Sequence, residues 1–313
     1  MSQRVTIFEV GPRDGLQNEP RVVTLRDKLR FISGLVSAGV GELELGSFVR
    51  LDRVPQMADT DLIYEAIRKR RLNLKRAHAW SLVPNQKGLE RALAVGAKRI
   101  AVFTAASESF NRKNIGMSIE ESLSDYQKLI LESKKQGVKV RGYVSTAFGC
   151  PFEGTVSSRQ ALHVIERLIK IGVAQVSIGD TIGVATPKSV NEVIKPALSL
   201  FGPEKIAVHF HDTRGTALAN SLRALELGVQ TFDSSAGGLG GCPFAPGATG
   251  NLATEDLVYM LDGMGIKTGI HLMRLAEVSL DFAKRIHRPL SSRYLLAFAS
   301  NCKLRKKTRK VRL

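Results

Sequence analysis

The feature that most restricts the fold of this chain is a strand-then-helix alternation that recurs about every thirty residues. Eight apolar segments are predicted as strands, at residues 5–10, 41–46, 77–83, 99–105, 138–147, 174–179, 206–211 and 231–235. This alternation is typical of a parallel sheet with helical crossovers. Eight units over about 260 residues match an α/β fold of the (β/α)8 TIM-barrel type. A doubly wound open sheet is the alternative, but no Gly-x-Gly-x-x-Gly pattern follows the first strand.

Helices are predicted between these strands from apolar spacing and from their end signals. Thr24 is placed to cap the first helix, with Asp27 in its first turn. Ser118 and Glu121 have the spacing of a capping box, and the long helix that they begin is expected to stop at Gly137. The remaining predicted helices cover residues 59–70, 86–95, 157–171, 187–200 and 215–227, and one begins at Thr254.

The C-terminal part of the chain lies beyond the eighth unit. Residues 269–302 are predicted as additional C-terminal helices that pack beside the barrel, so that 1–302 form a single catalytic domain. Residues 303–313 carry seven Lys or Arg and no acid, out of a net charge of +17. The tail is expected to be a disordered, solvated end, with contact to nucleic acid as the alternative function.

Composition restricts where the protein works. No run of eighteen apolar residues occurs, so no membrane contact is expected. Because a strand-like pattern begins within the first residues, no presequence is expected either. The sequence contains three cysteines, which are too few and too scattered for a disulfide framework. A reducing, cytoplasmic location is the prediction.

Polar residues gather where the predicted strands end, which is the active-site face of a TIM barrel. His209 and His211 are two apart on a strand, so both side chains point to one face. Alone, such a pair could equally be two hydrogen-bonded core histidines. Asp14 follows strand one and Asn251 follows strand eight, and barrel closure makes strands one, seven and eight neighbours. Two nitrogens and two oxygens suit Mg²⁺ or Mn²⁺ better than zinc, although Asn251 could instead cap the next helix.

Three further residues point to chemistry at the same face. Arg13 comes directly after strand one and could polarise a carbonyl or bind a carboxylate, or simply form a surface ion pair. Glu44 shares a strand face with Glu42, and one of them could be the ion-pair partner of Arg13. Cys242 lies in a loop that is rich in glycine and contains two prolines. We interpret it as a reactive thiol on a movable lid, rather than a small residue in a turn.

These segments together resemble the 3-hydroxy-3-methylglutaryl-CoA (HMG-CoA) lyases. The resemblance runs from about Val5 to Cys302, within the superfamily of metal-dependent barrels that includes isopropylmalate and homocitrate synthases. The stretches that carry it begin at Gly11, Val54, Phe148, Gly179, His209 and Gly237, and read GPRDGLQNE, VPQMAD, FGCPFEG, GDTIG, HFHD and GGLGGCP. The glycine loop with its cysteine separates the lyases from the synthases.

The resemblance implies a role for each candidate residue. A divalent cation, Mg²⁺ or Mn²⁺, would be held by Asp14, His209, His211 and Asn251. Arg13 would polarise the substrate carbonyl, Glu44 would support the site, Asp180 would lie near the reacting hydroxyl, and Cys242 would act as acid or base. The expected substrate is an acyl-CoA, and the expected assembly is a homodimer. Asp180 or a histidine not fully committed to the metal is the candidate base for the hydroxyl proton.

Some positions depart from the lyase pattern. Arg214 and Thr216 stand just after the two histidines, where tyrosine and glutamine are common in the family. A lyase for a longer 3-hydroxy-3-alkylglutaryl-CoA is therefore one alternative function. An acetyl-CoA-using acyltransferase of the synthase type is the other, and Cys242 with its loop argues against it.

Overall fold

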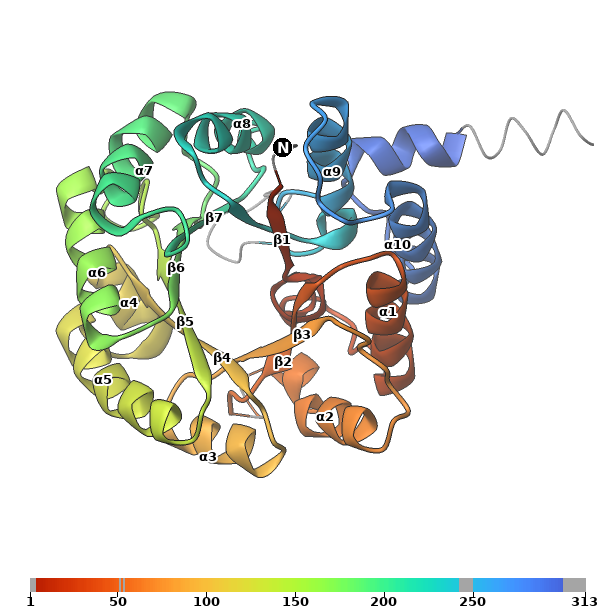
Figure 1. Cartoon of the computed structure of the whole chain (residues 1–313), viewed down its shortest axis with the longest axis horizontal. Helices are drawn as coiled ribbons and strands as arrows, with labels where there is room; N and C mark the ends of the chain where they lie inside the picture. Colours follow the sequence, from red (N-terminus) through yellow and green to blue (C-terminus); the bar gives the residue numbers. More distant parts are fainter. Residues whose placement is uncertain (1–3, 51, 53, 242–249, 301–313) are drawn as a thin grey trace, which may run out of the picture.

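The sheet is a closed barrel of eight parallel strands, as the sequence predicts. The computed structural model describes residues 4–50, 52, 54–241 and 250–300. The strands follow chain order around the barrel and β1 pairs with β8, which closes it. They are β1 (Thr6–Glu9), β2 (Glu42–Ser47), β3 (His78–Leu82), β4 (Arg99–Ala105), β5 (Lys139–Ser145), β6 (Gln175–Asp180), β7 (Ile206–Phe210) and β8 (Thr231–Ser234). The predicted TIM-barrel fold is confirmed (Figure 1).

Helices surround the barrel and cover its strands (Figure 1). They are α1 (Leu25–Ser37), α2 (Thr60–Arg68), α3 (Gln86–Ala94), α4 (Glu108–Ile115), α5 (Ile119–Lys135), α6 (Ser158–Ile171), α7 (Pro187–Phe201), α8 (Ala217–Leu227), α9 (Thr254–Gly263) and α10 (Leu272–Ile286). Thr24 caps α1 by accepting a hydrogen bond from the Asp27 N–H. Ser118 and Glu121 form the predicted capping box at α5.

The additional C-terminal helices are also present. α10 packs on α1 (Figure 1), and the rings of Phe31 and Phe282 stack with centroids 4.1 Å apart. Residues 293–300 form a further helical segment. The basic tail at 303–313, with its predicted disorder and nucleic-acid contact, lies outside the described residues. Among the helices that the structure describes, none is both long and apolar enough to cross a bilayer.

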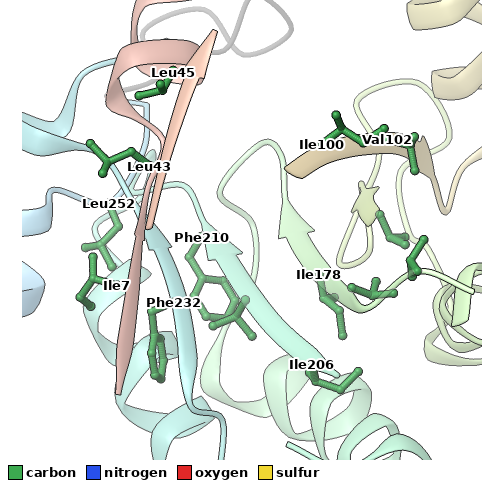
Figure 2. Close-up of a cluster of buried hydrophobic side chains, with 14 of the residues drawn as sticks. Ile7, Leu43, Leu45, Ile100, Val102, Ile178, Ile206, Phe210, Phe232 and Leu252 are labelled. Atoms are coloured by element: carbon green, nitrogen blue, oxygen red, sulfur yellow. The ribbon is translucent and has the colours of Figure 1, made fainter. Parts of the chain in front are cut away.

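Alternation along the strands divides the core into two layers. Figure 2 shows aliphatic and aromatic side chains such as Ile7, Leu43 and Ile178, which form part of the large hydrophobic cluster between strands and helices. The neighbouring positions on the strands face the lumen, where Phe8, Val10 and Trp80 form a separate small cluster. Polar side chains share this lumen, and the buried Arg141 is stacked over the Phe8 ring at 4.0 Å. The outer layer therefore stabilises the barrel, and the lumen is left for polar groups.

Candidate active site

A five-residue π-helix, η1 (Gly11–Gly15), places Arg13 and Asp14 at the mouth of the barrel directly after β1. The buried carboxylate of Glu9 fixes this segment, because Oε1 accepts hydrogen bonds from the N–H groups of both Gly11 and Ala236 at 2.8 Å. A Cβ atom at position 11 would lie only 2.5 Å from Glu9 Oε1, so a side chain there would disrupt this contact. Single-turn π segments are frequent at functional sites. The sequence did not reveal η1.

The side chains of Asp14, His209 and His211 converge above the lumen. One potential ligand atom from each lies within 4.8 Å of the others, and no other such group occurs within residues 4–50, 52, 54–241 and 250–300. The Nε2 atoms of the two histidines are 3.2 Å apart. The alternation of the strand thus directs both imidazoles to one point, as the spacing predicts.

Asn251 joins this cluster from the far end of the glycine loop. A backbone bridge pairs it with His211, and its Nδ2 donates hydrogen bonds to Asp14 Oδ2 at 2.9 Å and to the Leu239 carbonyl oxygen at 3.0 Å. Asn251 Oδ1 is buried and has no hydrogen-bond partner. A buried acceptor without a partner is costly. The structure thus brings the four predicted ligands together, and the free amide oxygen is a donor atom suited to a hard cation.

The electrostatics of the cluster also fit a cation. Burial would raise the pKa of Asp14, but the charge of Arg13 lowers it to about 2, so the carboxylate is ionised. Burial and the neighbouring His209 lower the pKa of His211 to about 4 and keep that imidazole neutral. Burial opposes the charge of His209 as well, but Asp233 and Asp14 raise its pKa. The carboxylates of Asp14 and Asp233, which favour a positive charge on His209, would also favour a metal ion beside it.

Arg13 is held firmly beside the cluster. Its Nε donates to Glu44 Oε2 and its Nη1 to Asp14 Oδ1, both at 2.6 Å. The Tyr143 hydroxyl donates to the same Glu44 oxygen at 3.1 Å. Burial opposes the charge of Arg13, but Glu44 and Asp14 raise its pKa above the ordinary value. Glu44 is therefore the partner of Arg13, and Glu42 bonds instead to the side chains of His78 and Trp80.

A cavity of about 800 Å³ opens over these groups. Arg13, Asp14, His209 and His211 lie at its floor, together with Tyr143 and Ser177. Basic side chains line it as well, namely Arg50, Arg112 and Lys113. A polar floor with a positively charged lining suits a large, anionic ligand.

Asp180, a predicted site residue, does not line this cavity, and neither does Arg214, which departs from the family pattern. Asp180 is buried, and its two carboxylate oxygens accept the N–H groups of Val184 and Ala185 at 2.9 Å. Burial raises the pKa of Asp180 to about 6, although these two hydrogen bonds act to lower it. Arg214 donates to the carbonyl oxygens of Ile182 and Gly183 and does not line the cavity. Both residues organise the loop after β6.

Cys242 lies outside the described residues. The neighbouring Gly241 lines the cavity, and its carbonyl oxygen accepts a hydrogen bond from Asn18 Nδ2 at 3.0 Å. Gly250, the first described residue after Gly241, accepts a hydrogen bond at its carbonyl oxygen from the Asp212 N–H. The two described ends of the loop therefore lie next to the candidate site.

Sequence reasoning missed a buried ion pair below the cavity. Arg141 on β5 binds both carboxylate oxygens of Asp233 on β8, with N–O distances of 2.5 and 3.0 Å. Burial would raise the pKa of Asp233, but the charge of Arg141 lowers it. Asp233 Oδ2 also lies 3.4 Å from His209 Nδ1. The available signal was one arginine and one aspartate at lumen-facing positions of β5 and β8.

Comparison with known proteins identifies the family. The sequence profile of the family described as HMGL-like matches residues 4–281. The chain belongs to this family. Hydroxymethylglutaryl-CoA lyase YngG of Bacillus subtilis is 45% identical over 299 residues, which cover 96% of this chain and 99% of YngG. The human mitochondrial hydroxymethylglutaryl-CoA lyase is 44% identical over 304 residues, with coverage of 97% and 91%.

Solved structures of HMG-CoA lyases share the fold of this family member. The Bacillus subtilis enzyme superimposes with a TM-score of 0.91 at 45% identity, covering 95% of this chain and 98% of that one. An Acinetobacter baumannii HMG-CoA lyase in complex with coenzyme A and 3-methylmalate gives 0.87 at 37% identity, covering 93% of each chain. The resemblance inferred from the sequence motifs is confirmed.

Proposed function

We propose that this protein is a divalent-metal-dependent carbon–carbon lyase that cleaves (S)-3-hydroxy-3-methylglutaryl-CoA to acetyl-CoA and acetoacetate. The observation that carries the proposal is the convergence of Asp14, His209 and His211 beside Arg13 in the lining of a cavity large enough for an acyl-CoA, with Asn251 bonded to Asp14. Membership of the HMGL-like family supports the same activity.

The four converging side chains would hold Mg²⁺ or Mn²⁺, the cations that a set of imidazole, carboxylate and amide donors accommodates. When bound, such an ion supplies Lewis-acid chemistry toward oxygen atoms of the substrate. Arg13 places its guanidinium where the thioester oxygen gains negative charge, and Glu44 and Asp14 fix its orientation.

The cleavage moves one proton away from the substrate and returns one. Loss of the tertiary hydroxyl proton lets the C3–O bond become a carbonyl while the C2–C3 bond breaks. The electron pair moves onto the thioester enolate, and Cys242 supplies the proton that converts C2 into the methyl group of acetyl-CoA. Of the two candidate bases, the histidines face the cavity and Asp180 does not. We therefore favour a histidine that is not fully committed to the metal as the proton acceptor.

A panel of 3-hydroxy-3-alkylglutaryl-CoA esters tests the function. With Mg²⁺ or Mn²⁺ present, we expect the 3-methyl compound, HMG-CoA, to be cleaved to acetoacetate and acetyl-CoA. Its kcat/KM should be higher than that of any compound with a longer 3-alkyl group. A higher kcat/KM for a compound with a longer 3-alkyl group would instead show a lyase for that substrate. Release of free thiol from acetyl-CoA and a 2-oxo acid, without cleavage of any ester, would establish the synthase-type activity instead.

Replacement of Cys242 by alanine tests the proton donor. We expect kcat to fall by about 10²–10⁴-fold, the usual contribution of a positioned acid or base. The matched control is Cys150→Ala, because Cys150 is buried in the core beside Ser107 and away from the cavity. Wild-type turnover in Cys242→Ala, with acetyl-CoA as product, would exclude the thiol as the acid.

A further inference from the structure

The buried pair Arg141 and Asp233 crosses the lumen beneath the metal-binding cluster. Its side chains are 1% and 0% exposed. Arg141 is wedged between aromatic faces, 4.0 Å from the Phe8 ring centroid and 5.0 Å from that of Tyr143. Because both nitrogens at the end of the guanidinium bind the carboxylate, the plane of Asp233 is fixed.

Asp233 contacts His209 from the side opposite the metal-binding atom. The two residues are register partners on β7 and β8, so their side chains leave the barrel wall on the same face. Asp233 Oδ2 lies 3.4 Å from His209 Nδ1, and within the described part of the chain this buried nitrogen has no hydrogen bond. Ser177 donates to the same carboxylate oxygen at 2.7 Å. The other ring nitrogen, Nε2, faces His211 in the cluster.

We propose that Asp233 is a positioning residue for His209, which keeps the imidazole proton on Nδ1 and leaves Nε2 free for a divalent cation, and that Arg141 holds Asp233 in place. The partner of the far ring nitrogen sets the tautomer of a ligating histidine. A buried carboxylate facing only a neutral imidazole would be costly, and the guanidinium offsets that cost. The proposal rests on the proposed metal site, but not on the identity of the acyl group.

Asp233→Asn separates positioning from packing, because it preserves shape. Both carboxylate oxygens of Asp233 accept from Arg141, but only Oδ2 also faces His209, and an amide keeps an acceptor at just one of the two positions. The variant loses the acceptor toward His209 when its NH₂ takes the Oδ2 position. His209 Nδ1 must then accept a hydrogen bond from this NH₂, so the ring proton moves to Nε2. A protonated Nε2 cannot bind the metal. A misplaced tautomer is how an equivalent change damages the serine-protease triad.

The measurement is the affinity of the metal-free, full-length protein for Mn²⁺, followed by the electron paramagnetic resonance signal of the free ion. We expect Asp233→Asn to weaken binding by about 10–100-fold. Nitrogen-15 NMR of histidine-labelled protein should show His209 protonated on Nδ1 in the wild type and on Nε2 in the variant. A purely structural role for the pair would leave this tautomer signature unchanged.

Two further variants guard against misfolding. Ser177→Ala removes one hydrogen bond to Asp233 without changing charge, and we expect a loss of affinity smaller than in Asp233→Asn. In Arg141→Met/Asp233→Asn the amide is free to turn its oxygen to His209, so affinity should recover toward the wild-type value. Wild-type affinity and tautomer in folded Asp233→Asn, or no recovery in a folded double variant, would overturn the proposal. Tight Mn²⁺ binding by His209→Ala would instead refute the metal site itself.

Discussion

Arg13→Met is expected to lower kcat by about 10²–10³-fold, the usual effect of removing one donor that stabilises developing negative charge. KM for the acyl-CoA should change much less, because the charge on the thioester oxygen arises mainly in the transition state. Glu44 and Asp14 occupy Nε and Nη1 of the guanidinium. Within the described residues, Nη2 makes no protein hydrogen bond, which leaves it available to the substrate.

Arg13→Lys separates charge from geometry. Lysine keeps the positive charge but cannot reproduce the planar fork that binds Glu44 and Asp14 together. We expect most of the loss in kcat to remain in this variant. Arg13→Met also leaves Glu44 buried without its cation, so Arg13→Met/Glu44→Gln serves as the folding control.

Enzyme-catalysed exchange of the acetyl-CoA methyl protons in D₂O provides a second readout of Arg13, because exchange passes through the same enolate. Exchange and cleavage should fall together in both Arg13 variants. If exchange stayed at the wild-type rate while cleavage was lost, Arg13 would act on the acetoacetate half of the substrate rather than on the thioester.

The barrel could be predicted because the same signal is repeated eight times. The limits of β4 agree with the prediction at both ends, and the other strands differ by one or two residues. The helix α4 was missed because it is short and mostly polar, with only Phe110 and Asn111 buried. Its available signal was Ser107, which caps it by accepting the Phe110 N–H.

The site could be predicted most directly where local spacing determines the direction of a side chain. His209 and His211 must share a face because a strand alternates, whatever their surroundings. The role expected of Asp180 came from the family resemblance, whereas the face on which its side chain lies depends on register, because a shift of one residue moves a side chain to the other face of the sheet. Gly179 pairs with His209 and takes the lumen-facing position, so Asp180 points the other way. The pairing of Asp233 with Arg141 joins residues 92 positions apart, and no local pattern encodes it.

Removal of the divalent cation should abolish turnover, and His211→Ala should come close to the same result. Lewis-acid stabilisation by a metal contributes several kcal/mol to the transition state. At about 1.4 kcal/mol for each factor of ten, we expect kcat/KM to fall by roughly 10³-fold. His211 is the suitable ligand to remove, since its Nδ1 makes no hydrogen bond in the described structure and its Nε2 contacts only another residue of the metal cluster, His209.

The experiment compares turnover of chelator-treated protein before and after Mg²⁺ or Mn²⁺ is restored. The wild type should recover fully, and His211→Ala should recover only at cation concentrations far above those that saturate the wild type. His163→Ala is the matched control, because His163 lies exposed on α6 and should behave as the wild type. Full activity of His211→Ala in the presence of chelator would remove the cation from the mechanism and leave Arg13 and Cys242 to carry the cleavage.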